Sequence, residues 1–240
     1  MRLLVPVLLV LLLHGSAVQE SHAERAYVIA HVEDSVDQLA ARAVLEEAYR
    51  RLDMKVEFRA MPAVQALEAS NGGKVAAELQ RIDGIQRRYP NLVQVPIPIN
   101  YIQGLAFSRD YNFPIRGWHS LRPHRVGIVK GILFAERGTA GMQVSVAKNH
   151  AELVEWIRDE KVDVGVMPRI SGLLAIKKSG ASKIKELKGV LETLMLYHYV
   201  HKSNADVAKR LGPVLKSMLL DGTTRRLRAQ AYDKILGRAK

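Results

Sequence analysis

Two arginines in this chain stand where a guanidinium group could hold an anion. Arg81 follows a predicted strand near residues 75–79, and Arg169 follows a predicted strand at 162–167. A planar guanidinium binds a carboxylate or phosphate through two parallel hydrogen bonds. Arg169 also begins a predicted helix, where backbone N–H groups favour negative charge. Both residues predict a site for a small anionic or zwitterionic ligand.

Four further side chains stand beside predicted strand ends or connections, and they complete the predicted site: Glu33, Tyr101, Lys130 and Ser171. In open α/β sheets, ligands bind beyond the carboxyl ends of the strands, where loops and helix N-termini converge. Lys130 is expected to face a bound anion. Tyr101 is expected either to stack on the ligand or to pack between two halves of the molecule.

The two arginines also have ordinary structural interpretations. Arg81 can be exposed to solvent, or it can pair with Glu78 or Asp83. Arg169 can be a solvated residue in the first turn of its helix. Sequence spacing does not decide between these alternatives and ligand binding.

The sequence gives little support for metal binding or catalysis. His198 and His201 have a helical ligand spacing, but their segment predicts a strand, in which residues i and i+3 point to opposite faces. The sequence has no Gly-x-Ser-x-Gly motif, no Walker-type phosphate loop and no cysteine. Because catalytic triads are assembled in space, a periplasmic hydrolase remains an alternative. We expect a binding protein that is not an enzyme and has no metal or cofactor.

The elements that would position these residues follow from the hydrophobic periodicity, which changes repeatedly between strand and helix patterns. The strands are expected at 27–30, 56–59, 75–79, 125–129, 142–146 and 162–167. Helices are expected at 36–52 and 62–71, after 131, and from 149 and 168. The order strand, helix, strand, helix, strand therefore occurs twice, which predicts two parallel-sheet α/β lobes in series.

Two extended segments are expected to connect the lobes. Residues 93–99 alternate in polarity but contain Pro96 and Pro98, which restricts them to a sheet edge or a connecting ribbon. Crossings near 102–110 and 193–200 would let helices at 205–219 and 223–236 return to the first lobe. The predicted fold is α/β with two hinge crossings, lobe 1 comprising 24–107 and 200–240 and lobe 2 comprising 108–199.

The N-terminus has the pattern of a secretory signal peptide, expected at residues 1–23. Arg2 precedes an apolar run from Leu3 to Leu13, and small residues follow it. Cleavage after Ala17 or after Ala23 fits this pattern. The alternative is a retained anchor, but the run is too short for a hydrocarbon core of about 30 Å. We therefore expect a periplasmic location.

The net charge of +12 invites a nucleic-acid-binding hypothesis. The charge is dispersed along the chain, and no helix-turn-helix, zinc-finger or RNA-binding signature accompanies it. We expect no nucleic-acid partner.

Several segments resemble the extracellular solute-binding proteins of family 3, which are associated with the import of polar amino acids. They are residues 59–67, 78–82, 89–93 and 125–131. The resemblance covers residues 25–238 and implies the two-lobed type II periplasmic-binding-protein fold. It also implies a small-molecule ligand and a membrane partner.

The chain departs from the amino-acid binders at two positions of the expected site. Where the relatives place an acidic residue for the ligand amino group, this chain has Met167, Pro168 and Arg169. The resemblance then leaves Glu33 to supply the acidic contact, and Arg109 is the nearby candidate for the arginine that holds the ligand carboxylate. These departures argue against a standard amino acid as the ligand, and the expected ligand is amino-acid-like.

The sequence thus predicts a monomeric periplasmic protein that captures its ligand by hinge closure. The closed form would be recognised by an inner-membrane permease of an ABC importer, or alternatively by a sensor receptor.

Overall fold

The computed structural model describes residues 27–33 and 35–238. The predicted signal peptide lies outside the described residues. Within the described part of the chain, no helix is both long enough and apolar enough to cross a membrane.

One half of the molecule is built on three parallel strands in the order β2-β1-β3. Its elements are β1 (Tyr27–Val32), α1 (Val36–Arg50), β2 (Val56–Met61), α2 (Ala63–Asn71) and β3 (Ala77–Ile82). The other half repeats this arrangement with strands in the order β6-β5-β7. Its elements are β5 (Val126–Val129), α3 (Leu133–Gly138), β6 (Val144–Ala147), α4 (His150–Arg158), β7 (Val164–Pro168) and α5 (Arg169–Ser179). The six expected strands are therefore confirmed, with ends shifted by up to three residues.

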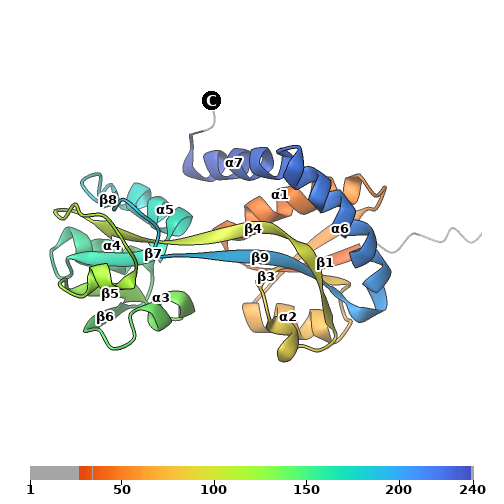
Figure 1. The fold of residues 1–240 in the computed structure, drawn as a ribbon, viewed down its shortest axis with the longest axis horizontal. Coiled ribbons are helices and arrows are strands. Elements are labelled where there is room, and N and C mark those ends of the chain that lie inside the picture. The colour runs from red at the N-terminus through yellow and green to blue at the C-terminus, as the bar shows by residue number, and fades with distance from the viewer. Residues whose placement is uncertain (1–26, 34, 239–240) are drawn as a thin grey trace, which may run out of the picture.

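Two long antiparallel strands join the halves, as Figure 1 shows: β4 (Leu92–Ser108) and β9 (Glu192–His201). β9 pairs with β3 in the first half, and β4 pairs with β7 in the second. The strands therefore form one continuous sheet, whereas the sequence predicted two sheets joined by crossings. The reason is the length of β4 and β9, which pair from Leu92↔His201 to Gly104↔Glu192.

The two prolines of β4 lie at an edge of the sheet, where the lack of an N–H group need not remove a hydrogen bond between strands. The register of the β4–β9 pair shifts between Gln94 and Pro98 and again between Pro98 and Asn100. The described pairings of β4 with β7 begin only at Gly104. Residues 92–98 thus lie at an edge of the sheet, which confirms the prediction from Pro96 and Pro98.

The remaining elements complete the two halves. After β9 the chain forms α6 (Ala205–Leu220) and α7 (Thr223–Leu236), which return to the first half as expected. A short strand, β8 (Lys185–Glu186), pairs with β4 in the second half. Single 3₁₀ turns occupy η1 (Ile85–Arg87), η2 (Trp118–Leu121) and η3 (Lys202–Asn204).

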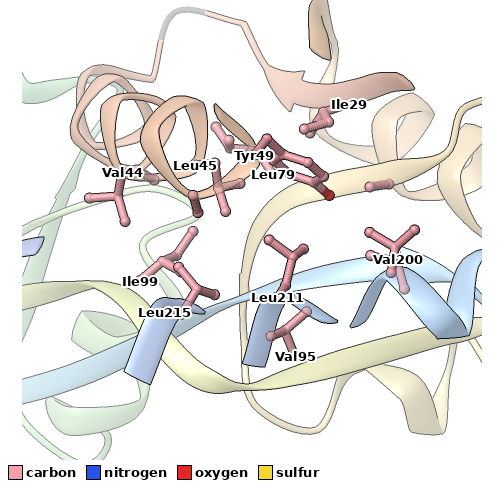
Figure 2. Packing of buried hydrophobic residues seen from close by; sticks show 14 of the residues in the cluster. Ile29, Val44, Leu45, Tyr49, Leu79, Val95, Ile99, Val200, Leu211 and Leu215 are labelled. Atoms are coloured by element: carbon pink, nitrogen blue, oxygen red, sulfur yellow. The ribbon is translucent and has the colours of Figure 1, made fainter. Parts of the chain in front are cut away.

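Each half has its own buried core. In the first half, apolar side chains of α1 and α6 pack against the sheet, and Figure 2 shows Leu45 of α1 and Leu211 of α6 with Ile99 of β4. In the second half, one cluster packs α4 and α5 on the sheet, and another packs α3 on the opposite face. Separate cores allow the halves to move as two bodies.

Glycines set how closely α4 packs on the second half of the sheet. Gly127 of β5 and Gly165 of β7 are register partners. A Cβ at Gly165 would lie 2.5 Å from the Cδ1 atom of Ile157, and one at Gly127 would lie 2.5 Å from the Cδ1 atom of Leu153. Both neighbours are buried side chains of α4. The helix can therefore approach this sheet only because these positions lack side chains.

We expect Gly165→Ala to lower the free energy of unfolding by about 1–3 kcal/mol, because overpacking displaces Ile157. Urea denaturation measures this loss. The control is Gly212→Ala in α6, where a Cβ meets no atom within 4 Å. It should be neutral or stabilising by up to ~1 kcal/mol, because alanine favours a helix. Equal stability of Gly165→Ala and the wild type would contradict this prediction.

Candidate functional site

A cavity of about 200 Å³ lies at the junction of the two halves. The first half lines it from α1 and α7, the second half lines it from α5, and β4 contributes residues 101–103. Helices α1, α5 and α7 lie on one side of the β4–β9 pair, and α2 and α3 lie on the other (Figure 1). We call this space the junction cavity.

Asn100 organises the first-half side of the junction cavity from within the protein. It is buried, and its Nδ2 atom donates to the backbone carbonyl of Asp37 at 2.9 Å and to Oε1 of Gln80 at 3.1 Å. Its Oδ1 atom accepts from Nε of Arg228 at 2.7 Å and from the hydroxyl of Tyr232 at 3.1 Å. One buried amide thereby fixes α7 relative to α1, β3 and β4.

Arg228 is held in a defined orientation by these contacts. Its guanidinium carbon lies 3.7 Å from the centre of the Tyr101 ring, the geometry of a cation–π contact. Because Nε is bound to Asn100, the outer edge of the guanidinium is directed away from that amide. Arg228 and Tyr101 both line the junction cavity.

Asp37, in the first turn of α1, supplies a carboxylate to the cavity although only 8% of its surface is exposed. Burial raises its pKa to about 6, and a hydrogen bond from Ser171 and the positive charge of Arg228 partly oppose this effect. Ser171 lies in α5, and α5 contacts α1, so Asp37 lies where the two halves meet.

Arg169 lines the cavity from the first position of α5. Its Nε and terminal nitrogen donate to the carboxylate of Glu186 at 3.0 and 2.9 Å. This ion pair is partly exposed, with 46% of the Arg169 side chain accessible. The structure therefore places Tyr101 and Arg169 in the lining of one cavity, whereas Ser171, two residues after Arg169 in α5, is not among its described lining residues.

Arg81 lies elsewhere and is bound within the first half. Its Nε atom donates to Glu78 at 2.8 Å, and a terminal nitrogen donates to the carbonyl of Ala63 at the start of α2 at 2.9 Å. Glu78 is fully buried, and burial raises its pKa to about 7 although Arg81 and Ser70 oppose the shift. The structure shows the pairing with Glu78, one of the alternatives that the sequence offered.

Two other predicted residues are also separate from the junction cavity. Lys130 is exposed where β5 ends, before α3, and Glu33 is exposed in the turn after β1. The described residues that line the cavity include neither of them, nor Arg81. Arg109 lines a different cavity in the second half, where it pairs with Asp110 and Glu160. Any ligand contact of these four residues would require another site or another arrangement of the halves.

The sequence prediction missed several lining residues, of which Asp37, Arg225 and Arg228 carry charge. The strand-end rule pointed to Glu33, four positions before Asp37. No periodicity signal shows that the face of α7 bearing Arg225 and Arg228 lies at the junction. Contacts between distant elements, α7 with α1 and α5, create this part of the site.

Several solved structures are similar to this fold over most of their length. A histidine kinase sensor domain with similarity to periplasmic binding proteins matches with a TM-score of 0.63 and 18% identity, covering 86% of this chain and 95% of that one. The probable amino-acid ABC transporter extracellular-binding protein YtmK from Bacillus subtilis matches with a TM-score of 0.69 and 17% identity, covering 86% and 98%. The chain has the two-lobed periplasmic-binding-protein-like fold.

Comparisons of the amino-acid sequence find a relative but do not assign the chain to a family. An uncharacterized protein from Shewanella oneidensis is 26% identical over 199 residues, covering 80% of this chain and 75% of its own. No protein-family model matches the chain. An ancestral arginine-binding protein bound to arginine shares the fold with a TM-score of 0.63 and 16% identity, covering 87% of this chain and 99% of that one. The binding-protein-like fold is thus established, and the ligand is not given by these similarities.

Proposed function

We propose that this chain is a periplasmic solute-binding protein. It captures a small anionic or zwitterionic ligand between its two lobes and presents it to an inner-membrane permease. The units that move are residues 24–107 with 200–240, and residues 108–199. Ligand binding shifts an equilibrium between open and closed arrangements, as in other hinged proteins.

The junction cavity is the observation that carries this proposal. Both lobes contribute charged groups to one space, Asp37 and Arg228 from the first and Arg169 from the second. A ligand held there contacts both lobes at once, so its binding energy depends on their relative position. The volume of about 200 Å³ lies below the usual range of roughly 300–1,000 Å³ for drug-sized pockets and suits a small metabolite.

A screen of organic acids and amino acids by thermal shift tests the proposal, with small-angle scattering of each hit. A ligand raises the melting temperature because it binds the folded state. It should also reduce the radius of gyration without being converted to a product. A hit that is turned over would support a hydrolase, and a complete screen without a shift or closure would contradict the proposal.

Arg228→Ala is expected to weaken binding of the hit about 10- to 100-fold, because a charge-assisted hydrogen bond contributes roughly 1.5–3 kcal/mol. Isothermal titration measures the change. The matched control is Arg226→Ala on the same helix, because Arg226 is exposed and bonds Gln230. An unchanged affinity in Arg228→Ala would remove the junction cavity as the ligand site.

A sensor receptor is the second candidate partner, and the similar histidine kinase sensor domain favours it. Genes for a permease and an ATPase beside this one would support the importer. A neighbouring kinase gene would support the sensor.

A further inference from the structure

Among the described lining residues of the junction cavity, positive charges outnumber negative ones. Arg169, Arg225 and Arg228 contribute three guanidinium groups, and Asp37 contributes one carboxylate. Glu186 neutralises Arg169 through its paired hydrogen bonds. The cavity and this partner therefore carry a charge of +1 when Asp37 is ionised and +2 when it is protonated.

Arg228 is the group best prepared to grip an anion. Asn100 holds its Nε atom, and the ring of Tyr101 supports its face at 3.7 Å. A guanidinium fixed in this way loses little conformational freedom on binding. Arg225 lies one helical turn earlier on α7 and lines the same space. The two residues are spaced to act on one ligand.

Asp37 controls the charge that a ligand meets. It is buried, with 8% of the residue exposed, and the positive charge of Arg228 acts on it. A carboxylate in this place repels an anion and attracts an ammonium group, whereas its protonated form does neither strongly. The response of binding to pH therefore separates an anionic ligand from a zwitterionic one.

We infer that the junction cavity selects a small anion carrying a carboxylate, sulfate or phosphate group, that Arg228 and Arg225 bind it, and that protonation of Asp37 accompanies binding. The inference rests on the proposed function, because it names the ligand class of the same cavity.

The titratable and charged groups that line the cavity beside Asp37 are Arg225, Arg228 and Tyr232 of α7 and Arg169 of α5. Of these, the arginines remain charged in the relevant pH range, and burial raises the pKa of Tyr232 above its usual value. Asp37 is thus the lining group that changes charge between pH 5 and pH 7.5.

Isothermal titration of the full chain with sodium sulfate at pH 5.0 and pH 7.5, at constant ionic strength, tests this inference. Sulfate is ionised at both values, so its own titration does not contribute. We expect binding to be about tenfold tighter at pH 5.0, on the scale of one charge interaction across a partly buried site. Asp37→Asn should bind sulfate equally at both pH values, with the wild-type affinity of pH 5.0. Arg225→Ala should weaken binding, and the control Arg226→Ala should not.

Glycine, a zwitterion at both pH values, supplies the opposing outcome. Glycine binding that weakens at pH 5.0 and disappears in Asp37→Asn would show that Asp37 holds an ammonium group, and it would overturn the inference. Absence of sulfate binding, with lobe closure by an amino acid of the screen and by no organic acid, would overturn the inference and leave the proposed function standing. Absence of closure by every compound would overturn both.

Discussion

Asn100→Ala is expected to lower the free energy of unfolding by about 3–5 kcal/mol and to loosen α7 from the junction. The side chain is 2% exposed and makes four hydrogen bonds. Its loss leaves the Asp37 carbonyl, the Gln80 amide and the Tyr232 hydroxyl without these partners. Each unsatisfied buried group costs roughly 1–3 kcal/mol, and the truncated side chain leaves a void.

Urea denaturation followed by circular dichroism measures the loss, and hydrogen exchange of α7 amides locates it. The control is Asn91→Ala, because the Asn91 side chain donates one hydrogen bond, to the Asn71 carbonyl at 3.0 Å. That variant should lose about 1 kcal/mol. Equal losses in the two variants would show that Asn100 does not organise the junction.

The second large effect concerns pH and a fully buried histidine. Nδ1 of His198 lies 3.1 Å from the Leu79 carbonyl, and Nε2 lies 2.9 Å from the Tyr49 hydroxyl. Nδ1 therefore carries the proton and donates to the carbonyl, and Nε2 accepts from the tyrosine. Burial lowers the pKa of His198 from 6.5 to about 4.

Below pH 6.5 the unfolded chain binds a proton at His198 that the folded protein does not. The contribution of this residue to stability is therefore intact above pH 6.5 and is lost as the pH falls towards 4, by about 3 kcal/mol at 1.36 kcal/mol per pKa unit. Asp37 and Glu78 act in the opposite direction, because their folded pKa values are raised to about 6 and about 7. Their contributions grow as the pH falls from 7, and on the same scale the two carboxyl groups together exceed the loss at His198.

His198→Gln isolates the histidine. The free energy of unfolding of this variant, minus that of the wild type, should rise by about 3 kcal/mol between pH 7 and pH 4. Urea denaturation at a series of pH values measures this difference. His201→Gln at the end of the same strand controls for the exchange of histidine for glutamine. A constant difference between His198→Gln and the wild type would contradict the assignment.

The repeated α/β order was predictable because buried strands and amphipathic helices leave distinct hydrophobic patterns. Residues 205–219 and 223–236, for example, were expected as helices and form α6 and α7 almost to the residue. The continuous sheet was not predictable in this way. It depends on how β4 and β9 pair along their length, and the prolines of β4 argued only for an edge, which they do occupy in the first lobe.

The position of Arg81 shows why side-chain roles were harder to predict. In a regular strand Glu78 and Arg81 point to opposite faces. The register of the β3–β9 pair shifts between these two residues, and their side chains form an ion pair. A bulge of this kind has no clear signature in the sequence, so ligand binding, solvent exposure and pairing with Glu78 or Asp83 all remained open for Arg81.

The double strand that joins the lobes has a mechanical consequence. A loop hinge bends freely, but β4 and β9 are tied to each other by backbone hydrogen bonds on both sides of the junction. Under the proposed hinge closure, relative rotation of the lobes must therefore twist this ribbon. In that motion, a twisted ribbon of this kind would store elastic energy and favour the return of the lobes to their resting arrangement.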